Sequence, residues 1–413
     1  MFIENRKNEI NNILLKMAEI LDISPSQYED AVSKYQAVAD YLGRDLEINK
    51  LMPEMYPQGS FNLGTIIKPS SDEEEYDIDL VCELKLGSTK TISQDTLKNL
   101  IGNRLKSGMY KEKLKDLDGG RRCWTIEYSE SAKLHLDILP AIPDYDSRIL
   151  FESKSFFEHS ENYGKTAISI TDSENEYYYE LHDDWVKSNP KGYLTWFKEQ
   201  MLTSLNESRK LFSEANKTKI DEVPDYKIKT PLQRAIQLLK RHRDTTCGDN
   251  VDKPISIIIT TLSALAYKNE NNLYDALTGI LKNMSNHIEH DIQNGKKVAI
   301  ISNPVDYREN FADKWEFFPN KEKVFYDWLN DAQIYFENLF KTEKEIGWIN
   351  ESLSSGFGSG ITRKTFSAIA NETRTNRENG ILRMENITGI LGTNIALSES
   401  KKVTDHKFHG NEK

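Results

Sequence analysis

The amino-acid sequence predicts an α+β fold with two lobes, in which a mixed sheet flanked by helices adjoins a helical lobe and the active site lies in the cleft between them. Three observations favour this fold. The chain has 413 residues, enough for more than one domain of ordinary size. Short β-like runs separated by polar or glycine-rich turns fill residues 57–143. Beyond about residue 181, apolar residues recur at helical spacing instead.

These patterns divide the chain into four parts. We expect residues 1–50 to form helices that back the core, 51–180 the α/β core, 181–350 the helical lobe, and 351–413 a flexible loop and C-terminal tail. The last part begins with Ser352–Gly360, which is rich in Gly and Ser and is therefore predicted to be a loop. Residues after about Thr365 are predicted to be weakly structured.

Individual elements follow from local signals. In the first part, Ile10, Leu14 and Met17 recur at helical spacing, and Ser24 before Pro25 is typical of the start of a second helix. The strand-like runs are residues 76–84, 123–128 and 133–139. The helical patterns of the second lobe are residues 193–212, 230–244, 254–267, 273–284 and 321–340.

Composition excludes several classes of protein. Hydrophobic residues make up 38% and charged residues 29%, as in an ordinary soluble domain. No stretch approaches the roughly 18 apolar residues of a membrane helix, and the N-terminus lacks the apolar run of a signal peptide, so we expect a cytoplasmic protein with no membrane partner. The three cysteines are far apart, which predicts reduced thiols rather than disulfides or a zinc site. The net charge of −11 does not favour nucleic-acid binding.

Two acids on one strand suggest a metal site. In the run Tyr76-Asp77-Ile78-Asp79-Leu80, side chains alternate, so Asp77 and Asp79 project from one face while the apolar residues are buried on the other. A pair of carboxylates so close together repels itself unless a cation lies between them. Hard oxygen ligands favour Mg²⁺ or Mn²⁺.

Asp137 has a similar setting in Leu134-His135-Leu136-Asp137-Ile138, and it would complete a three-carboxylate site if its strand lay beside the first. Three carboxylates can bind two divalent ions, as in-line phosphoryl transfer requires. The preceding turn, Gln58-Gly59-Ser60, fits the same chemistry, because glycine lets the backbone approach a phosphate and serine adds a donor. Each motif alone is common, as a solvated strand face or an ordinary turn, but their ordered combination predicts a divalent-metal site suited to phosphoryl transfer.

This combination resembles the signature of polymerase-β-like nucleotidyltransferases. More narrowly, the chain is similar to the bacterial cGAS/DncV-like nucleotidyltransferases, the enzymes that make the signal in CBASS anti-phage systems. The segments that carry the narrower resemblance are Tyr56–Thr65, Tyr76–Leu84, Leu134–Pro143, Ser188–Phe197, Leu238–Asp244 and Asn303–Trp315.

The resemblance implies a polymerase-β-like core with a helical lobe, two Mg²⁺ or Mn²⁺ ions, and nucleoside triphosphates, ATP among them, bound in the cleft. It implies their condensation into a cyclic di- or trinucleotide with release of pyrophosphate, and it also implies regulatory or conjugating partner proteins and an effector that responds to the product. The metal ligands would be Asp77, Asp79 and Asp137, with Asp137 beside the attacking hydroxyl.

Further site residues are implied by the same resemblance. Gln58, Gly59 and Ser60 match the phosphate turn, and Lys240 and Ser256 match residues that touch the triphosphate, although a lysine at that position is also typical of a solvated surface. Asn303 or Asp306 is expected to approach a nucleotide. The list of expected substrate-binding residues is Gln58, Gly59, Ser60, Lys240, Ser256, Asn303 and Asp306.

The chain also departs from relatives of this superfamily. The animal member of the superfamily, cGAS, binds DNA with a zinc ribbon, and this sequence has no His/Cys cluster that resembles one. The chain is also acidic, so direct activation by DNA is not expected. The segment 406–410 loosely resembles tails that are conjugated through a terminal glycine, but three more residues follow it. Two other functions remain open here: a template-independent polymerase that makes linear oligonucleotides or tails RNA, and a nucleotidyl-transfer toxin.

Overall fold

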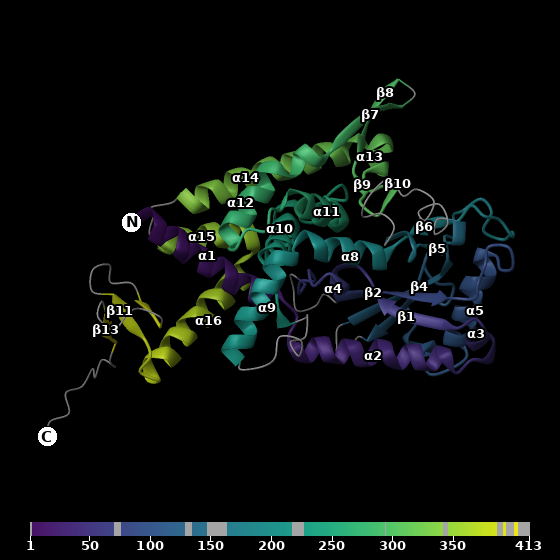
Figure 1. Cartoon of the computed structure of the whole chain (residues 1–413), viewed down its shortest axis with the longest axis horizontal. Coiled ribbons are helices and arrows are strands. Elements are labelled where there is room, and N and C mark those ends of the chain that lie inside the picture. Colours follow the sequence, from purple (N-terminus) through teal and green to yellow (C-terminus); the bar gives the residue numbers. More distant parts are fainter. Residues whose placement is uncertain are drawn as a thin grey trace.

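The computed structural model describes residues 2–69, 76–128, 134–146, 163–216, 227–293, 295–341, 346–385, 391–393 and 400–403. Figure 1 shows an elongated molecule with a sheet lobe at one end and a helical lobe at the other. This arrangement confirms the predicted α+β fold with two lobes.

A mixed six-stranded sheet forms the first lobe. Its strands are β1 (Pro53–Pro57), β2 (Tyr76–Leu84), β3 (Trp124–Tyr128), β4 (Leu134–Pro143), β5 (Ile168–Ile170) and β6 (Val186–Ser188). The order is β1-β2-β4-β5-β6, and β3 pairs with β4 as well. Strands β2 and β4 are parallel, whereas all other pairs are antiparallel. The central parallel pair carries the three predicted metal ligands.

Helices cover one face of this sheet. They are α2 (Pro25–Gly43), α3 (Leu46–Lys50) and α5 (Gln94–Lys106), accompanied by the short turns α4 (Gly59–Asn62) and η1 (Lys111–Lys113). Helix α2 begins as predicted, since the Ser24 hydroxyl accepts from the backbone N–H of Gln27, whose side chain in turn accepts from the N–H of Ser24. Ile78 and Leu80 of β2 are fully buried against this helical layer. The opposite face of the sheet is left for the acids.

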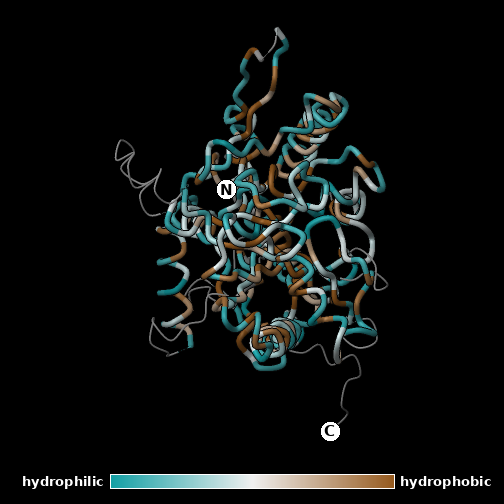
Figure 2. The backbone as a smooth tube through the Cα atoms, turned by 90° about the vertical axis from the view of Figure 1, so that its right-hand side faces the viewer, coloured by the Kyte–Doolittle hydropathy of each residue, from teal (hydrophilic) through white to brown (hydrophobic). Residues whose placement is uncertain are grey.

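The second lobe is mainly helical. Its helices are α8 (Pro190–Gln200), α9 (Leu202–Asn216), α10 (Pro231–Cys247), α11 (Ser256–Ala266), α12 (Leu273–Asn283), α13 (Asp313–Phe317), α14 (Pro319–Lys341), α15 (Ile346–Phe357) and α16 (Ser359–Glu378), with the short turn η4 (Met284–His287). Two antiparallel ribbons are attached, β7 (Glu289–Gln293) with β8 (Lys296–Ile300), and β9 (Ser302–Asn303) with β10 (Asp306–Asn310). A small sheet follows α16, made of β11 (Arg383–Glu385), β12 (Leu391–Gly392) and β13 (Ser400–Lys402). In Figure 2, hydrophobic segments gather inside the body, while the β7–β8 hairpin projects from its top.

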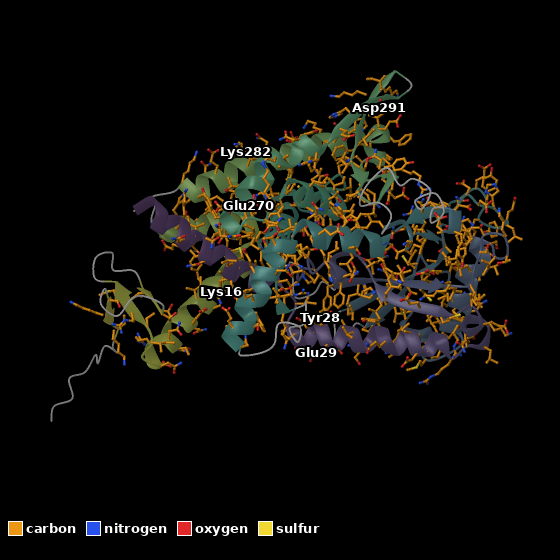
Figure 3. The ribbon with its side chains drawn as sticks, in the orientation of Figure 1. Lys16, Tyr28, Glu29, Glu270, Lys282 and Asp291 are labelled. Carbon is orange, nitrogen blue, oxygen red and sulfur yellow. The ribbon has the colours of Figure 1, made fainter. Side chains whose placement is uncertain are left out.

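The first helix does not back the sheet, so that part of the prediction is wrong. Helix α1 (Phe2–Leu21) buries Ile10, Leu14 and Met17 in the core of the helical lobe. Lys16, labelled in Figure 3, pairs with Glu372 of α16 at 2.9 Å. An apolar stripe shows that a helix packs against something, but it does not indicate which lobe provides the partner.

The predicted loop at Ser352–Gly360 is also wrong. Residues 346–357 form α15 and residues 359–378 form α16. Ile349, Leu353 and Phe357 lie one helical turn apart and are at most 1% exposed, so their burial outweighs the low helix propensity of the neighbouring Gly and Ser. The break falls at Gly358, whose φ of +91° separates the two helices.

The boundary between the lobes also lies further along the chain than expected, because β6 extends the sheet to residue 188. The tail segment 406–410 lies outside the described residues. Within the part of the chain that the structure describes, every helix is either too short or too polar to cross a membrane.

Candidate active site

The three acids lie on neighbouring strands. In the parallel pairing of β2 with β4, Asp79 is opposite Asp137, and Asp77 is opposite His135. Paired residues share one face of a sheet, so all three carboxylates are on the side away from α2 and α5. The prediction that the strand of Asp137 lies beside the first is therefore confirmed.

The phosphate turn packs directly against Asp79. The backbone N–H of Gln58 donates to the carbonyl oxygen of Asp79 at 2.8 Å. Gly59 follows with a φ of +61°, and a Cβ added there would lie 2.5 Å from Asp79 Oδ2. Behind this turn, the ring of Phe61 stacks on Tyr28, labelled in Figure 3, with 4.8 Å between ring centroids. Glycine is thus required here both by the backbone conformation and by the close approach of a carboxylate.

A cavity of about 660 Å³ lies between the helical lobe and the face of the sheet that carries the three acids. Gly59, Ser60 and all three acids line it on one side, and Lys240 and Ser256 line it on the other. Its volume is in the range of sites for small ligands and cofactors. Seven of the predicted site residues therefore line one cavity. They are Gly59, Ser60, Asp77, Asp79, Asp137, Lys240 and Ser256.

The acids repel one another electrostatically. Burial, followed by the nearby Asp137 and Asp77 carboxylates, raises the pKa of Asp79 to about 6. Burial and Asp137 also raise the pKa of Asp77, while His135 acts in the opposite direction. The cluster therefore carries an unfavourable concentration of negative charge, which a bound cation would relieve.

Asp137 and Asp77 each have a polar neighbour that orients the carboxylate. The Thr125 hydroxyl on β3 donates to Asp137 Oδ1 at 2.5 Å. His135 Nδ1 lies 3.3 Å from Asp77 Oδ1. Neither Thr125 nor His135 was recognised as a site residue from the sequence, because only their pairing across strands places them beside the acids.

Helix α10 provides the opposite wall and holds the segment that follows the phosphate turn. Side chains from this helix and from the residues just before it donate to backbone carbonyls of residues 63–68. The donors are Lys229, Gln233, Gln237, Lys240 and Arg241, and their acceptors are the carbonyl oxygens of Gly64, Leu63, Ile66, Thr65 and Lys68, respectively. The two lobes are therefore joined through the backbone of the segment that follows the phosphate turn.

Lys240 and Ser256 have internal partners in this wall. Lys240 is 5% exposed, and its ammonium group donates to the Thr65 carbonyl at 3.0 Å. Burial, followed by the Arg243 guanidinium, lowers the pKa of Lys240 to about 8. The Ser256 hydroxyl accepts from Arg243 at 3.1 Å. Both side chains still line the cavity, and both keep a donor for a phosphate, because Ser256 only accepts from Arg243 and an ammonium group has three N–H donors.

Three predicted substrate-binding residues are not part of this cavity wall. Asn303 donates to Glu309 at 2.7 Å and Asp306 is paired with Arg308, both within the β9–β10 ribbon. Gln58 contributes its backbone to the phosphate turn, but its side chain is not part of the lining. Other residues of the wall were not proposed from the sequence, namely Thr65, Asp244, Asp249, Lys253 and Thr260. Thr65 and Asp244 end two of the segments that carry the resemblance, whereas Asp249, Lys253 and Thr260 lie outside them and join the wall only through the contact between lobes.

The donor set suits a divalent cation such as Mg²⁺. Three carboxylates border one cavity and offer only oxygen ligands. Among the described residues, no group of three or more His, Cys, Asp or Glu side chains, the three acids included, stands close enough together to hold a metal ion. An open arrangement is compatible with Mg²⁺, which usually takes only one or two carboxylates and completes its shell with water and substrate phosphates.

The contact between Thr125 and Asp137 gives a first testable prediction. Thr125→Val keeps the shape of the side chain but removes its donor, so Asp137 loses its orienting hydrogen bond. We expect the activity of the enzyme to fall by about tenfold, the lower end of the usual effect of removing a hydrogen bond that orients a carboxylate of a site. The measurement is kcat at saturating nucleotide, with Thr125→Ser as the matched control that retains the donor. Equal rates for the two variants would contradict this role.

Comparison with known proteins supports the same assignment. The profile of the family described as "Cyclic GMP-AMP synthase DncV-like, nucleotidyltransferase domain" matches residues 53–140. The chain is 30% identical to a protein named c-di-GMP synthase from Roseivirga ehrenbergii, over 98% of both chains.

Two solved structures share the fold. The CdnG nucleotidyltransferase of Bradyrhizobium diazoefficiens, solved in complex with GTP, has a TM-score of 0.66 at 20% identity, covering 88% of this chain and 99% of that one. CdnC of E. coli MS115-1, solved with ATP, has a TM-score of 0.56 at 14% identity, covering 85% and 98%. Together with the nearly full-length match to the Roseivirga protein, these findings establish that the chain belongs to the bacterial cGAS/DncV-like nucleotidyltransferases.

Proposed function

We propose that this protein condenses two nucleoside triphosphates into a cyclic dinucleotide and releases pyrophosphate, with GTP as substrate and cyclic di-GMP as product. The observation that carries the proposal is the convergence of Asp77, Asp79 and Asp137 on one cavity with the Gly59 turn. The relative matched along 98% of the chain is named c-di-GMP synthase, which supports guanine as the base. ATP, expected among the substrates from the sequence, is the alternative.

The triphosphate would lie between the phosphate turn and α10. Gly59 lets the backbone approach a phosphate closely, and the Ser60 hydroxyl is available as a donor beside it. Lys240 and Ser256 face the same cavity from the helical lobe. A charged ammonium group and a hydroxyl on that wall would donate to the outer phosphates while they keep their present partners, Thr65 and Arg243.

The proposal includes Mg²⁺ or Mn²⁺, two ions, held by Asp77, Asp79 and Asp137. When bound, such ions lower the pKa of an attacking hydroxyl and neutralise charge on the departing pyrophosphate. Asp137 would accept the proton of the attacking ribose hydroxyl, which is supported by the hydrogen bond from Thr125 engaging only Oδ1 of this carboxylate. Each of two successive transfers forms one ribose–phosphate ester bond and breaks one bond between the α- and β-phosphates.

Further proposals concern the setting of the reaction. We propose a cytoplasmic enzyme of anti-phage defence whose cyclic product activates an effector. Regulation by a protein partner is supported by CdnC, which was also solved in a complex with HORMA.

The product assay tests the proposal. Purified protein is incubated with all four radiolabelled nucleoside triphosphates and Mg²⁺ or Mn²⁺, the mixture is treated with phosphatase, and the resistant products are identified by mass analysis. We expect cyclic di-GMP from wild-type protein and no resistant product from Asp77→Ala/Asp79→Ala. A cyclic product with adenine would correct the base.

Other products would contradict the proposal. Linear oligonucleotides that phosphatase attacks would favour the polymerase alternative, and label on a protein or RNA would favour a transferase toxin. If wild-type protein forms no small product with either metal, the assay is repeated with candidate activators, and continued failure overturns the proposal.

A further inference from the structure

A line of three polar side chains crosses the site on neighbouring strands. Glu127 of β3 is opposite His135 of β4, and His135 is opposite Asp77 of β2. Because paired residues share a face, all three lie on the face that carries the metal-binding acids. The register of three strands, rather than any sequence motif, creates this line.

The distances place the imidazole ring between two carboxylates. Nδ1 of His135 lies 3.3 Å from Asp77 Oδ1, and Nε2 lies 3.6 Å from Glu127 Oε1. Lys115 Nζ lies 3.9 Å from the same Glu127 oxygen. The His135 side chain is only 18% exposed, so the ring is enclosed by the strands on either side. Neither ring nitrogen faces away from a carboxylate.

Asp77 needs such a contact more than the other two acids. Asp79 is packed against Gly59, and Asp137 accepts a hydrogen bond from Thr125. The Asp77 side chain is 65% exposed, so packing alone leaves its rotamer free. An unrestrained ligand must lose conformational entropy each time it binds a cation, which lowers affinity.

We propose that His135 is a positioning residue for Asp77 and that Glu127 fixes the His135 ring. The imidazole holds Oδ1 of Asp77 and so restricts the rotamer of this acid, which lines the cavity. Carboxylates that ligate metals are commonly held in place by hydrogen bonds from the residues behind them. This inference rests on the proposed metal-dependent function, and it assigns no proton transfer to His135.

Matched variants separate the hydrogen bond from packing. His135→Leu fills the space but removes both nitrogens. His135→Asn retains a nitrogen donor near the position of Nδ1, and so keeps the contact with Asp77 but not that with Glu127. Glu127→Gln weakens the support of the ring, while Glu112→Gln changes an exposed acid of the same lobe and serves as the control.

Direct binding of Mn²⁺ is measured by electron paramagnetic resonance on the full-length chain with a non-hydrolysable GTP analogue. We expect His135→Leu to raise the Kd for Mn²⁺ by roughly 10–100-fold and His135→Asn to restore most of this loss. Glu127→Gln should have a smaller effect in the same direction, and Glu112→Gln none. The Mn²⁺ concentration for half-maximal activity should shift in parallel, with a smaller change in kcat at saturating metal.

The outcomes are distinguishable from failure of the proposed function. Wild-type protein that binds Mn²⁺ through the three acids, and binds it less well after His135→Leu, supports this inference even if the product is not a cyclic dinucleotide. Unchanged Mn²⁺ affinity in a folded His135→Leu variant overturns it. Equal losses in His135→Leu and His135→Asn also overturn it, since the asparagine retains the donor. If His135→Leu does not fold, unchanged affinity in Glu127→Gln overturns the proposal.

Discussion

Asp79→Asn is expected to abolish activity while making the folded protein more stable. The substitution removes a charge that would bind both metal ions, and loss of a group at the reacting centre typically lowers kcat by about 1000-fold or more. The same charge is unfavourable for the fold, because burial and the carboxylates of Asp137 and Asp77 raise the pKa of Asp79 to about 6. Asparagine has a similar shape and no charge.

The sign of the stability effect follows from proton linkage. The pKa of Asp79 is raised from 3.8 to about 6, so the folded state holds the proton more tightly than the unfolded state. The contribution of Asp79 to stability is therefore most favourable below pH about 4 and falls as the pH rises towards 6. Above that pH the contribution of this group stays nearly constant. At neutral pH the ionised carboxylate costs on the order of 2–3 kcal/mol.

Thermal unfolding and activity are measured together. At pH 7.5 the Tm of Asp79→Asn should exceed that of wild type by several degrees, and the difference should be smaller at pH 5. Addition of Mn²⁺ should raise the Tm of wild type more than that of the variant, because binding to the folded state stabilises it. A variant that is less stable than wild type at neutral pH would show that Asp79 is held by favourable contacts instead of being strained by its neighbours.

The acids and the phosphate turn are predictable from sequence because strand alternation is local. Asp77 and Asp79 are two residues apart in an apolar strand, so their common face follows from the period of a strand alone. Asp137 required one additional assumption, that two apolar strands lie side by side, and the pairing of β2 with β4 confirms it. Core strands have few alternative neighbours, which is why this assumption held.

Residues that act across elements were not predictable in the same way. Thr125 and His135 reach the acids only through the register of β3 and β4. Asn303 and Asp306 belong to a segment with family resemblance, yet their side chains pair within their own ribbon. A sequence pattern shows which residue types are present, but it does not determine which of several nearby polar groups each side chain will bind.

The contact between the lobes is the largest feature that the sequence did not indicate. Long polar side chains of α10 are buried, although such residues are usually solvated. They are buried because the backbone carbonyls of residues 63–68 lack strand or helix partners and accept hydrogen bonds from them instead. The irregular backbone that follows the phosphate turn thus has its carbonyl groups satisfied by the opposite lobe.

Gly59→Ala is expected to reduce activity far more than it reduces stability. Gly59 has a φ of +61°, which costs an alanine roughly 1–2 kcal/mol. The new Cβ would also lie 2.5 Å from Asp79 Oδ2, well inside van der Waals contact, so the carboxylate must turn away from its place in the cavity. A displacement of about 1 Å at a reacting centre can cost about 100-fold in rate.

Gly295→Ala separates the effect of backbone strain from the effect of the contact with Asp79. Gly295 has a φ of +78° in the turn between β7 and β8, and a Cβ there would meet nothing within 4 Å. Alanine therefore introduces backbone strain of the same kind without contact with an acid. We expect both variants to lose a similar amount of stability in chemical unfolding, whereas kcat falls about 100-fold only in Gly59→Ala. Similar kcat values for the two variants would mean that the close approach to Asp79 does not control the position of that carboxylate, and that Gly59 serves only the conformation of the turn.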